Sequence, residues 1–124
     1  MGYINANLNP LGKIVGDCVV RSISAVTEKP WVDVFLDLSI EGIKQKDMPS
    51  SNNVWGGYLY SLGFQKRSLP STCPHCYTMR EFADDHPIGR YVVGTGTHAV
   101  AVIDGNYIDT WDSGDQIPAY YWEK

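Results

Sequence analysis

The sequence has no long apolar run, no cluster of basic residues and few cysteines. No stretch approaches the roughly 20 consecutive apolar residues that a membrane-spanning helix needs. The chain carries 10 lysine and arginine residues against 14 aspartate and glutamate residues, which gives a formal charge of −4. Binding to a phosphate backbone requires clustered positive charge. These absences predict a protein that binds neither membranes nor nucleic acids.

Cysteine is scarce as well, and its number is odd. Three cysteines cannot all pair within one chain, which argues against a framework made only of disulfides. The first residues, MGYINANLNPLGK, lack the basic start and apolar stretch of a signal peptide. We therefore expect a cytoplasmic location. We expect no cofactor, since GTG at 94–96 is too short for a phosphate-binding loop. The sequence leaves the oligomeric state open.

What is present predicts one globular domain over residues 1–124. A chain of 124 residues can bury a substantial core without metals or disulfides, and 44% of its residues are hydrophobic. No internal repeat or low-complexity segment interrupts it. The 4 tryptophans and 8 tyrosines exceed what a small core requires. Some aromatic side chains are therefore expected to line a cleft.

Helical patterns fill the first part of the chain. Residues 1–16 are rich in Asn, Gly and Pro and predict an irregular lead-in. Apolar residues then recur at helical spacing over 17–27, and again over 31–43 after Pro30. A third helix is expected to begin at Ser51 or Asn52. A loop follows over QKRSLPSTCPHC, and TMREFADDHP predicts a short helix with the Thr and Glu of a capping box.

Beyond residue 90 the apolar pattern changes from helical spacing to alternation. The segments RYVVGT, HAVAVID, NYIDTWD and AYYWEK predict β-strands. Asp104-Gly105 is a dipeptide favoured in two-residue hairpin loops. Helices followed by strands predict an α+β fold, with N-terminal helices packed on a C-terminal antiparallel sheet.

Cys18, in the segment VGDCVVRS, is a candidate nucleophile. It stands at the start of a predicted helix, where free N–H groups and the helix dipole favour the thiolate. Asp17 opposes this by its charge, unless its carboxylate turns away to cap the helix. Taken alone, a cysteine in an apolar helix is more often an inert core thiol. A catalytic interpretation therefore requires a base and an acid that orients it.

The base must be one of three histidines. His75 lies between two cysteines in a loop, and His86 precedes a proline at a helix end. His98 opens the apolar strand HAVAVIDG directly after the predicted turn at GTG. A histidine at a strand end, next to a helix start, is a geometry that catalysis uses. We therefore prefer His98.

The register of the predicted hairpin selects the acid. With Asp104-Gly105 as a two-residue loop, Asp109 becomes a diagonal neighbour of His98 on the same sheet face. Such neighbours lie about 7–8 Å apart, within side-chain reach. Asp112 would point to the other face, because side chains alternate along a strand. We therefore prefer Asp109 to Asp112.

The order of Cys18 at a helix start, His98 opening a later strand and Asp109 on the next strand resembles the papain-like cysteine peptidases. The matching motifs are GDCVVRS, HAVAVIDG and YIDTWDS, and the likeness is closest to the bacterial C39-like branch. It implies a helical half bearing the nucleophile, a sheet half bearing base and acid, and a cleft between them. It also implies a Cys-His-Asp triad that cleaves a peptide or isopeptide bond of a peptide or protein substrate, or transfers the acyl group to an amine.

The resemblance has two departures. The family usually carries a glutamine shortly before its cysteine as the oxyanion donor, and this chain has none there. Asn9 is the candidate substitute. The acid is commonly followed by proline, whereas Asp109 is followed by threonine. Trp111, which faces His98 in the predicted hairpin, and Trp55 are candidates for the substrate cleft.

Other interpretations remain open. The CPHC motif at 73–76 is compatible with a metal site, a redox pair or plain loop thiols, but a single CxxC is a weak zinc signal and we predict no metal. Arg21, one turn after Cys18, could pair with an acid or bind a substrate carboxylate, but we prefer a solvated arginine. A second functional hypothesis is a non-catalytic papain-like binding or inhibitor protein of phage or mobile-element origin.

Overall fold

The computed structural model describes residues 2–124 as four helices and one six-stranded sheet, which confirms the α+β class. The helices are α1 (Cys18–Thr27), α2 (Trp31–Gln45), α3 (Asn52–Ser61) and α4 (Met79–Asp85). The strands are β1 (Gly2–Asn5), β2 (Gln65–Ser68), β3 (Arg90–Gly94), β4 (Ala99–Ile103), β5 (Asn106–Asp109) and β6 (Tyr120–Glu123). Their order in the sheet is β1-β5-β4-β3-β6-β2. None of the helices within residues 2–124 is long and apolar enough to cross a membrane.

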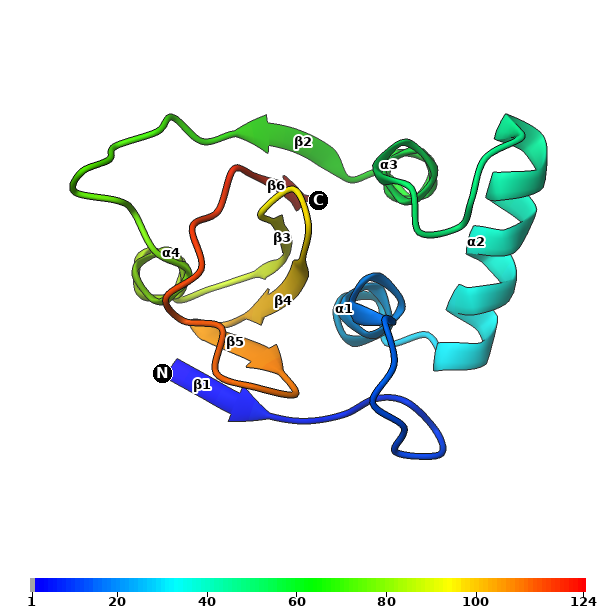
Figure 1. Ribbon diagram of the computed structural model, residues 1–124, viewed down its shortest axis with the longest axis horizontal. Helices are drawn as coiled ribbons and strands as arrows, with labels where there is room; N and C mark the ends of the chain where they lie inside the picture. Colours follow the sequence, from blue (N-terminus) through cyan, green and yellow to red (C-terminus); the bar gives the residue numbers. More distant parts are fainter. Residues whose placement is uncertain (1) are drawn as a thin grey trace.

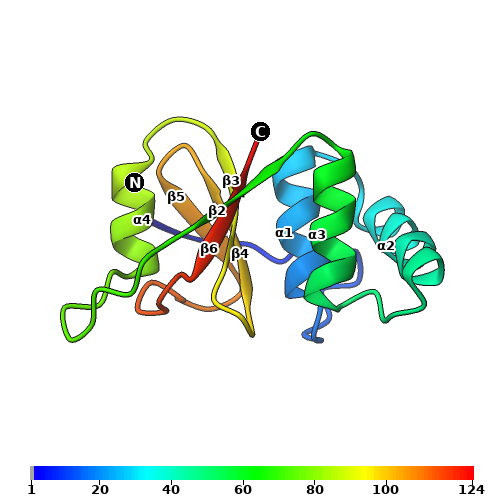
Figure 2. The same cartoon turned by 90° about the horizontal axis from the view of Figure 1, so that it is seen from above.

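Helices cover both faces of the sheet (Figure 1). Helix α4 packs on one face, against β5 and β1, and α1 packs on the other face, against β4 and β3. Helix α2 packs against both α1 and α3 and lies on their far side from the sheet (Figure 2). Helix α1 is therefore enclosed between the sheet and α2.

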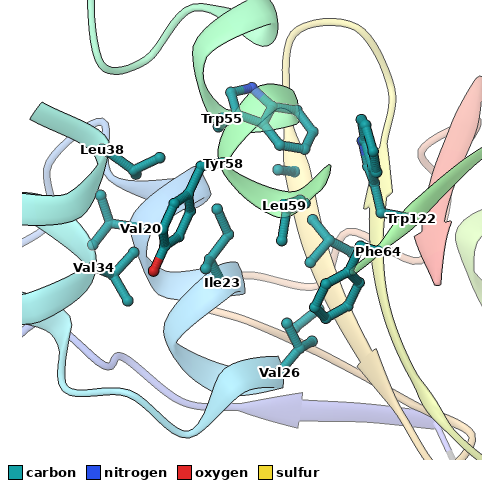
Figure 3. Packing of buried hydrophobic residues seen from close by; sticks show 13 residues of the cluster. Val20, Ile23, Val26, Val34, Leu38, Trp55, Tyr58, Leu59, Phe64 and Trp122 are labelled. Atoms are coloured by element: carbon teal, nitrogen blue, oxygen red, sulfur yellow. The ribbon is translucent and has the colours of Figure 1, made fainter. Parts of the chain in front are cut away.

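The larger core fills the space between α1, α3, α2 and the sheet (Figure 3). The central strands present the small residues Ala99 and Ala101 to α1, and this allows the helix to approach β4 closely. Apolar side chains at helical spacing on α1 fill the interface from the other side. Those buried on the three helices include Val20, Ile23, Val26, Val34, Leu38, Trp55 and Leu59.

A smaller core lies between α4 and the opposite face of the sheet. Val93, Val100 and Val102 alternate in sequence with the residues that face α1, as the two-residue period of a strand requires. The predicted capping box at Thr78 and Glu81 is present and starts α4, whose buried residues are Met79, Phe82 and Ala83.

The predicted hairpin is confirmed. Asp104 has φ 48° and Gly105 has φ 83°, the positive values that a two-residue loop of this kind needs at both positions. Ile103 consequently pairs with Asn106, and Ala101 pairs with Ile108. This register fixes which side chains of β4 and β5 are neighbours.

The sheet is mixed rather than antiparallel, which corrects the sequence-based expectation. β1 runs parallel to β5 and pairs Asn5 with Asp109, although residues 1–16 predict only an irregular segment. β2 occupies part of the expected loop and pairs with β6. Its residues, QKRS, are all exposed, so they carry none of the apolar alternation by which a strand is recognised.

The packing of Leu59 predicts its contribution to stability. Leu59→Ala empties a fully buried site and should lower the free energy of unfolding by about 2–5 kcal/mol. Leu11→Ala is the matched control, because Leu11 is 78% exposed and should change stability by less than about 0.5 kcal/mol. Urea denaturation followed by circular dichroism measures both. Equal effects would contradict the core assignment.

Candidate active site

Three elements meet at one end of the molecule. Cys18 is the first residue of α1, His98 directly precedes β4, and Asp109 is the last residue of β5. Because β4 and β5 form an antiparallel hairpin, the start of one lies beside the end of the other. The loop between β3 and β4 reaches the same end as the starts of α1 and α3 (Figure 2). The fold thus brings together residues that are far apart in sequence.

The His98 ring stands between Cys18 and Asp109. The Nε2 atom of His98 lies 2.7 Å from Oδ2 of Asp109. The thiol of Cys18 lies beside the His98 ring and the backbone of Ala99, and both lower its pKa. Since Nε2 is held by Asp109, Nδ1 is the ring nitrogen left to face the sulfur. The proximity of His98 and Asp109 predicted from the hairpin register is thus present.

The electrostatic environment favours a separated pair of charges. Burial raises the pKa of the Cys18 thiol, but hydrogen bonds from His98 and Ala99 and the positive charges of His98 and Arg21 outweigh it. The pKa of Cys18 is therefore below its ordinary value. The hydrogen bond to Asp109, followed by that to Cys18, raises the pKa of His98 to about 9. Near neutral pH His98 is therefore protonated, and its positive charge favours the thiolate of Cys18.

Asp109 is held as a buried carboxylate. Its side chain is 1% exposed, and it also accepts a hydrogen bond of 2.8 Å from the backbone N–H of Thr110. Burial raises the pKa of Asp109, but the hydrogen bonds that it accepts, first that of His98, and the charge of His98 lower it below its ordinary value. Asp109 is therefore negatively charged when His98 is positively charged.

Arg21 is part of this site, and the sequence-based expectation of a solvated arginine is wrong. The residue is only 9% exposed. Its Nη1 atom donates to Oδ1 of Asp109 at 3.2 Å, and its Nε atom donates to Oδ1 of Asp17 at 2.8 Å. One guanidinium thus joins Asp109 to the residue that precedes Cys18. A planar donor with several N–H groups can bridge two carboxylates in this way.

Asp17 does not cap α1 through its side chain. Its carboxylate is turned inward, where it accepts hydrogen bonds from Arg21, from Trp31 Nε1 at 3.0 Å and from Asn9 Nδ2 at 3.3 Å. The spacing of Asp17 and Arg21, four residues apart in a helix, is the one available sequence signal for this pair. That spacing does not reveal burial, so the network was missed.

Asn9 does not occupy the oxyanion position proposed for it. Its amide nitrogen donates to Asp17, and its carbonyl oxygen accepts from the N–H groups of Leu11 and Lys13. Asn9 is also absent from the residues that line the cleft beside Cys18. Its side chain instead fixes the loop that precedes α1.

A cleft of about 260 Å³ opens beside Cys18 and His98. Its walls include Gly16 and Gly96, and its polar groups include Ser50 and Asn52. Trp55 forms part of the lining, as the sequence predicts for a cleft residue, although only 2% of its surface is exposed.

Trp111 does not line this cleft. Its ring lies 5.1 Å from the His98 ring, between centroids, in a tilted stack. It is 46% exposed and covers the histidine from the solvent side. The hairpin register predicts that Trp111 faces His98, and this accounts for the contact. The expectation that Trp111 lines the cleft is corrected.

The CPHC motif lies outside the site. Cys73 and Cys76 form a disulfide, so they are neither plain thiols nor a Cys-Cys-His site, and Cys18 is the free cysteine. Across residues 2–124, no three Cys, His, Asp or Glu side chains are grouped closely enough to hold a metal ion. His86 stacks on Phe82, and its Nδ1 atom donates a hydrogen bond to the carbonyl oxygen of Phe82. His86 therefore lies at the α4 core, far from Cys18.

Comparison of the chain with protein-family models, with curated proteins and with solved structures finds no match. The site is therefore interpreted from its own geometry.

Removal of Arg21 should destabilise the protein much more than removal of an exposed arginine. Arg21→Met leaves two buried carboxylates without their shared cation and should lower the free energy of unfolding by about 3–5 kcal/mol. Arg67→Met is the matched control, since Arg67 forms a pair of the same 2.8 Å length with Glu123 but is 50% exposed. Its loss should cost less than about 1 kcal/mol. Urea denaturation gives both values, and similar losses would show that burial of the network adds nothing.

Proposed function

We propose that the protein is a papain-like cysteine hydrolase that cleaves a peptide or isopeptide bond. The observation that carries this proposal is the position of the His98 ring, which is hydrogen-bonded to the buried Asp109 carboxylate and lies beside the Cys18 thiol in one cleft. An activated nucleophile, a base within reach and a group that orients the base are the parts that covalent acyl transfer requires. An inert core thiol needs none of them.

In the proposed reaction the Cys18 thiolate attacks the carbonyl carbon of the substrate amide. The resulting oxyanion is stabilised by the backbone N–H of Cys18, which stands at the positive end of α1. The imidazolium of His98 gives its proton to the nitrogen of the leaving amine as the carbon–nitrogen bond breaks. A thioester to Cys18 remains, and the first product leaves.

Hydrolysis of the thioester completes the cycle. His98, now neutral, accepts a proton from a water molecule whose oxygen attacks the thioester carbonyl. The carbon–sulfur bond breaks, the acid product leaves, and the thiolate–imidazolium pair is restored. Throughout, Asp109 holds the His98 ring through Nε2 and stabilises its positive charge. Replacement of water by an amine would turn the same steps into acyl transfer.

The arrangement of layers supports the papain-like interpretation. The nucleophile belongs to the helical half of the molecule, the base and acid belong to the sheet, and the cleft lies where the two halves meet. Because the glutamine is missing, the available oxyanion donors are backbone N–H groups and the side-chain amide of Asn52, which lines the cleft. In the proposed reaction these donors are sufficient for catalysis.

Replacement of the base tests the proposal directly. His98→Ala should reduce kcat/KM for a cleaved peptide by roughly 10²- to 10⁴-fold, because general acid–base catalysis contributes about that much. His75→Ala is the matched control, since His75 lies in an exposed loop outside the site. Assays with quenched fluorescent peptide pools measure both. If the wild type cleaves no peptide and Cys18 is no more reactive than a free thiol, the non-catalytic binding protein becomes the better interpretation.

The ion pair predicts a specific pH dependence. Without reductant, Cys73 and Cys76 are joined, so iodoacetamide should alkylate only Cys18. Its rate should rise with pH through a midpoint below the ordinary cysteine pKa of about 8.5, because the thiolate is the reacting form. Hydrolysis should rise over the same range and fall above about pH 9, where His98 loses the proton that the leaving amine needs.

His98→Ala provides the control for that measurement. Without the imidazolium, the alkylation midpoint should move upward, toward or beyond about 8.5, because burial raises the pKa of the thiol. An unchanged midpoint, determined by mass spectrometry of the modified peptide, would show that His98 does not activate Cys18.

A further inference from the structure

A second hollow lies on the opposite side of the nucleophile's helix from the sheet. It has a volume of about 380 Å³, within the range of ligand pockets. Its walls come from residues 15–17, from the first turn of α1, from α2 and from the loop between α2 and α3, and no strand residue contributes. They include Val19, Val20, Trp31, Phe35, Leu38 and Met48.

The walls of this hollow are apolar. Among the described lining residues Asp17 alone is ionisable, and its carboxylate is already occupied by Arg21, Trp31 and Asn9. Val20 and Leu38 are buried in the core behind it and give it a firm base (Figure 3). At its mouth, Phe35 is 49% exposed and Met48 is 68% exposed. A charged side chain would lose its hydration here without finding a partner.

The hollow adjoins the cleft at Cys18. Gly16, Val19 and Ser50 line both spaces. Gly16 is exposed, and a side chain at this position would meet no atom within 4 Å of its Cβ. The boundary that the hollow shares with the cleft therefore has open space at Gly16.

We propose that this hollow, the Gly16 pocket, binds one bulky apolar side chain of a peptide substrate, aromatic or branched aliphatic, close to the bond that Cys18 attacks. The proposal rests on the proposed function, since it assigns the substrate class of the same site. The occupant is a side chain rather than a separate ligand because the pocket adjoins the cleft in which the substrate carbonyl would react. The apolar walls exclude charged residues from this position.

Peptide cleavage tests the substrate preference. Quenched peptides that differ at single positions on either side of the scissile bond should be cleaved best with Phe or Leu at one of them. The kcat/KM ratio of Phe to Ala at that position should be about 10- to 200-fold, the range that an apolar pocket achieves. Asp or Lys there should be poorer than Ala. Cleavage without any such preference would overturn the pocket assignment and leave the proposed function intact.

Two variants connect the preference to the pocket. Gly16→Leu places a side chain at the boundary between cleft and pocket and should reduce the Phe-to-Ala ratio to near one. Phe35→Ala removes part of the mouth and should reduce the ratio several-fold. Ile40→Ala is the matched control, because Ile40 is 44% exposed on the same helix but does not line the pocket. It should leave the ratio unchanged, and an equal effect of Ile40→Ala would assign the preference elsewhere.

A binding measurement separates failure of the pocket from failure of the proposed function. The Cys18→Ser protein is titrated with N-acetyl-phenylalaninamide and N-acetyl-alaninamide, and the indole N–H of Trp31 is followed by NMR. The phenylalanine compound should shift this resonance at concentrations where the alanine compound does not. A shift without peptide cleavage by the wild type would retain the pocket and reject the hydrolase. Absence of a shift in the Phe titration would reject the pocket.

Discussion

The contact on which the site depends most is the double hydrogen bonding of the Asp109 carboxylate, one oxygen to His98 and the other to Arg21. A carboxylate that is almost fully enclosed needs such partners, because an unpaired buried charge is strongly unfavourable. Arg21 in turn requires Asp17. Negative and positive groups therefore alternate along the network, from Asp17 through Arg21 and Asp109 to His98. Packing of α1 against the small residues of β4 places this network inside the protein, where its interactions are little screened.

Much of the fold could be predicted from local patterns. The helical stripes, the capping box at Thr78 and the Asp104-Gly105 hairpin each follow from residues close together in sequence. β1 could not be recognised because it lies in a segment rich in Asn, Gly and Pro, and β2 could not because it is entirely polar. Their strand conformation is imposed by pairing with β5 and β6. The parallel direction of β1 likewise depends on the path of the whole chain.

The part of the candidate site that depends on the Asp104-Gly105 turn was predictable from the sequence. A two-residue loop fixes the register of β4 and β5, so His98 and Asp109 could be placed together without a structure. Pairing of Arg21 with an acid was one alternative, but its burial could not be predicted, because four-residue spacing from Asp17 occurs equally on exposed helices and burial depends on the packed fold. Asn9 was assigned a role by its position upstream of Cys18. The structure shows that loop geometry directs its amide to Asp17 instead.

The separation of the site residues along the chain has a consequence during synthesis of the protein. Arg21 and Asp109 are 88 positions apart, and the strand that bears Asp109 closes on both β4 and β1. While the chain leaves the ribosome, Cys18 emerges long before His98 and Asp109 have been made. During that interval it has neither a base nor an enclosed environment and is an ordinary thiol. The pKa of the Cys18 thiol is thus lowered only when the sheet is complete. The thiol of an unfinished chain has ordinary reactivity.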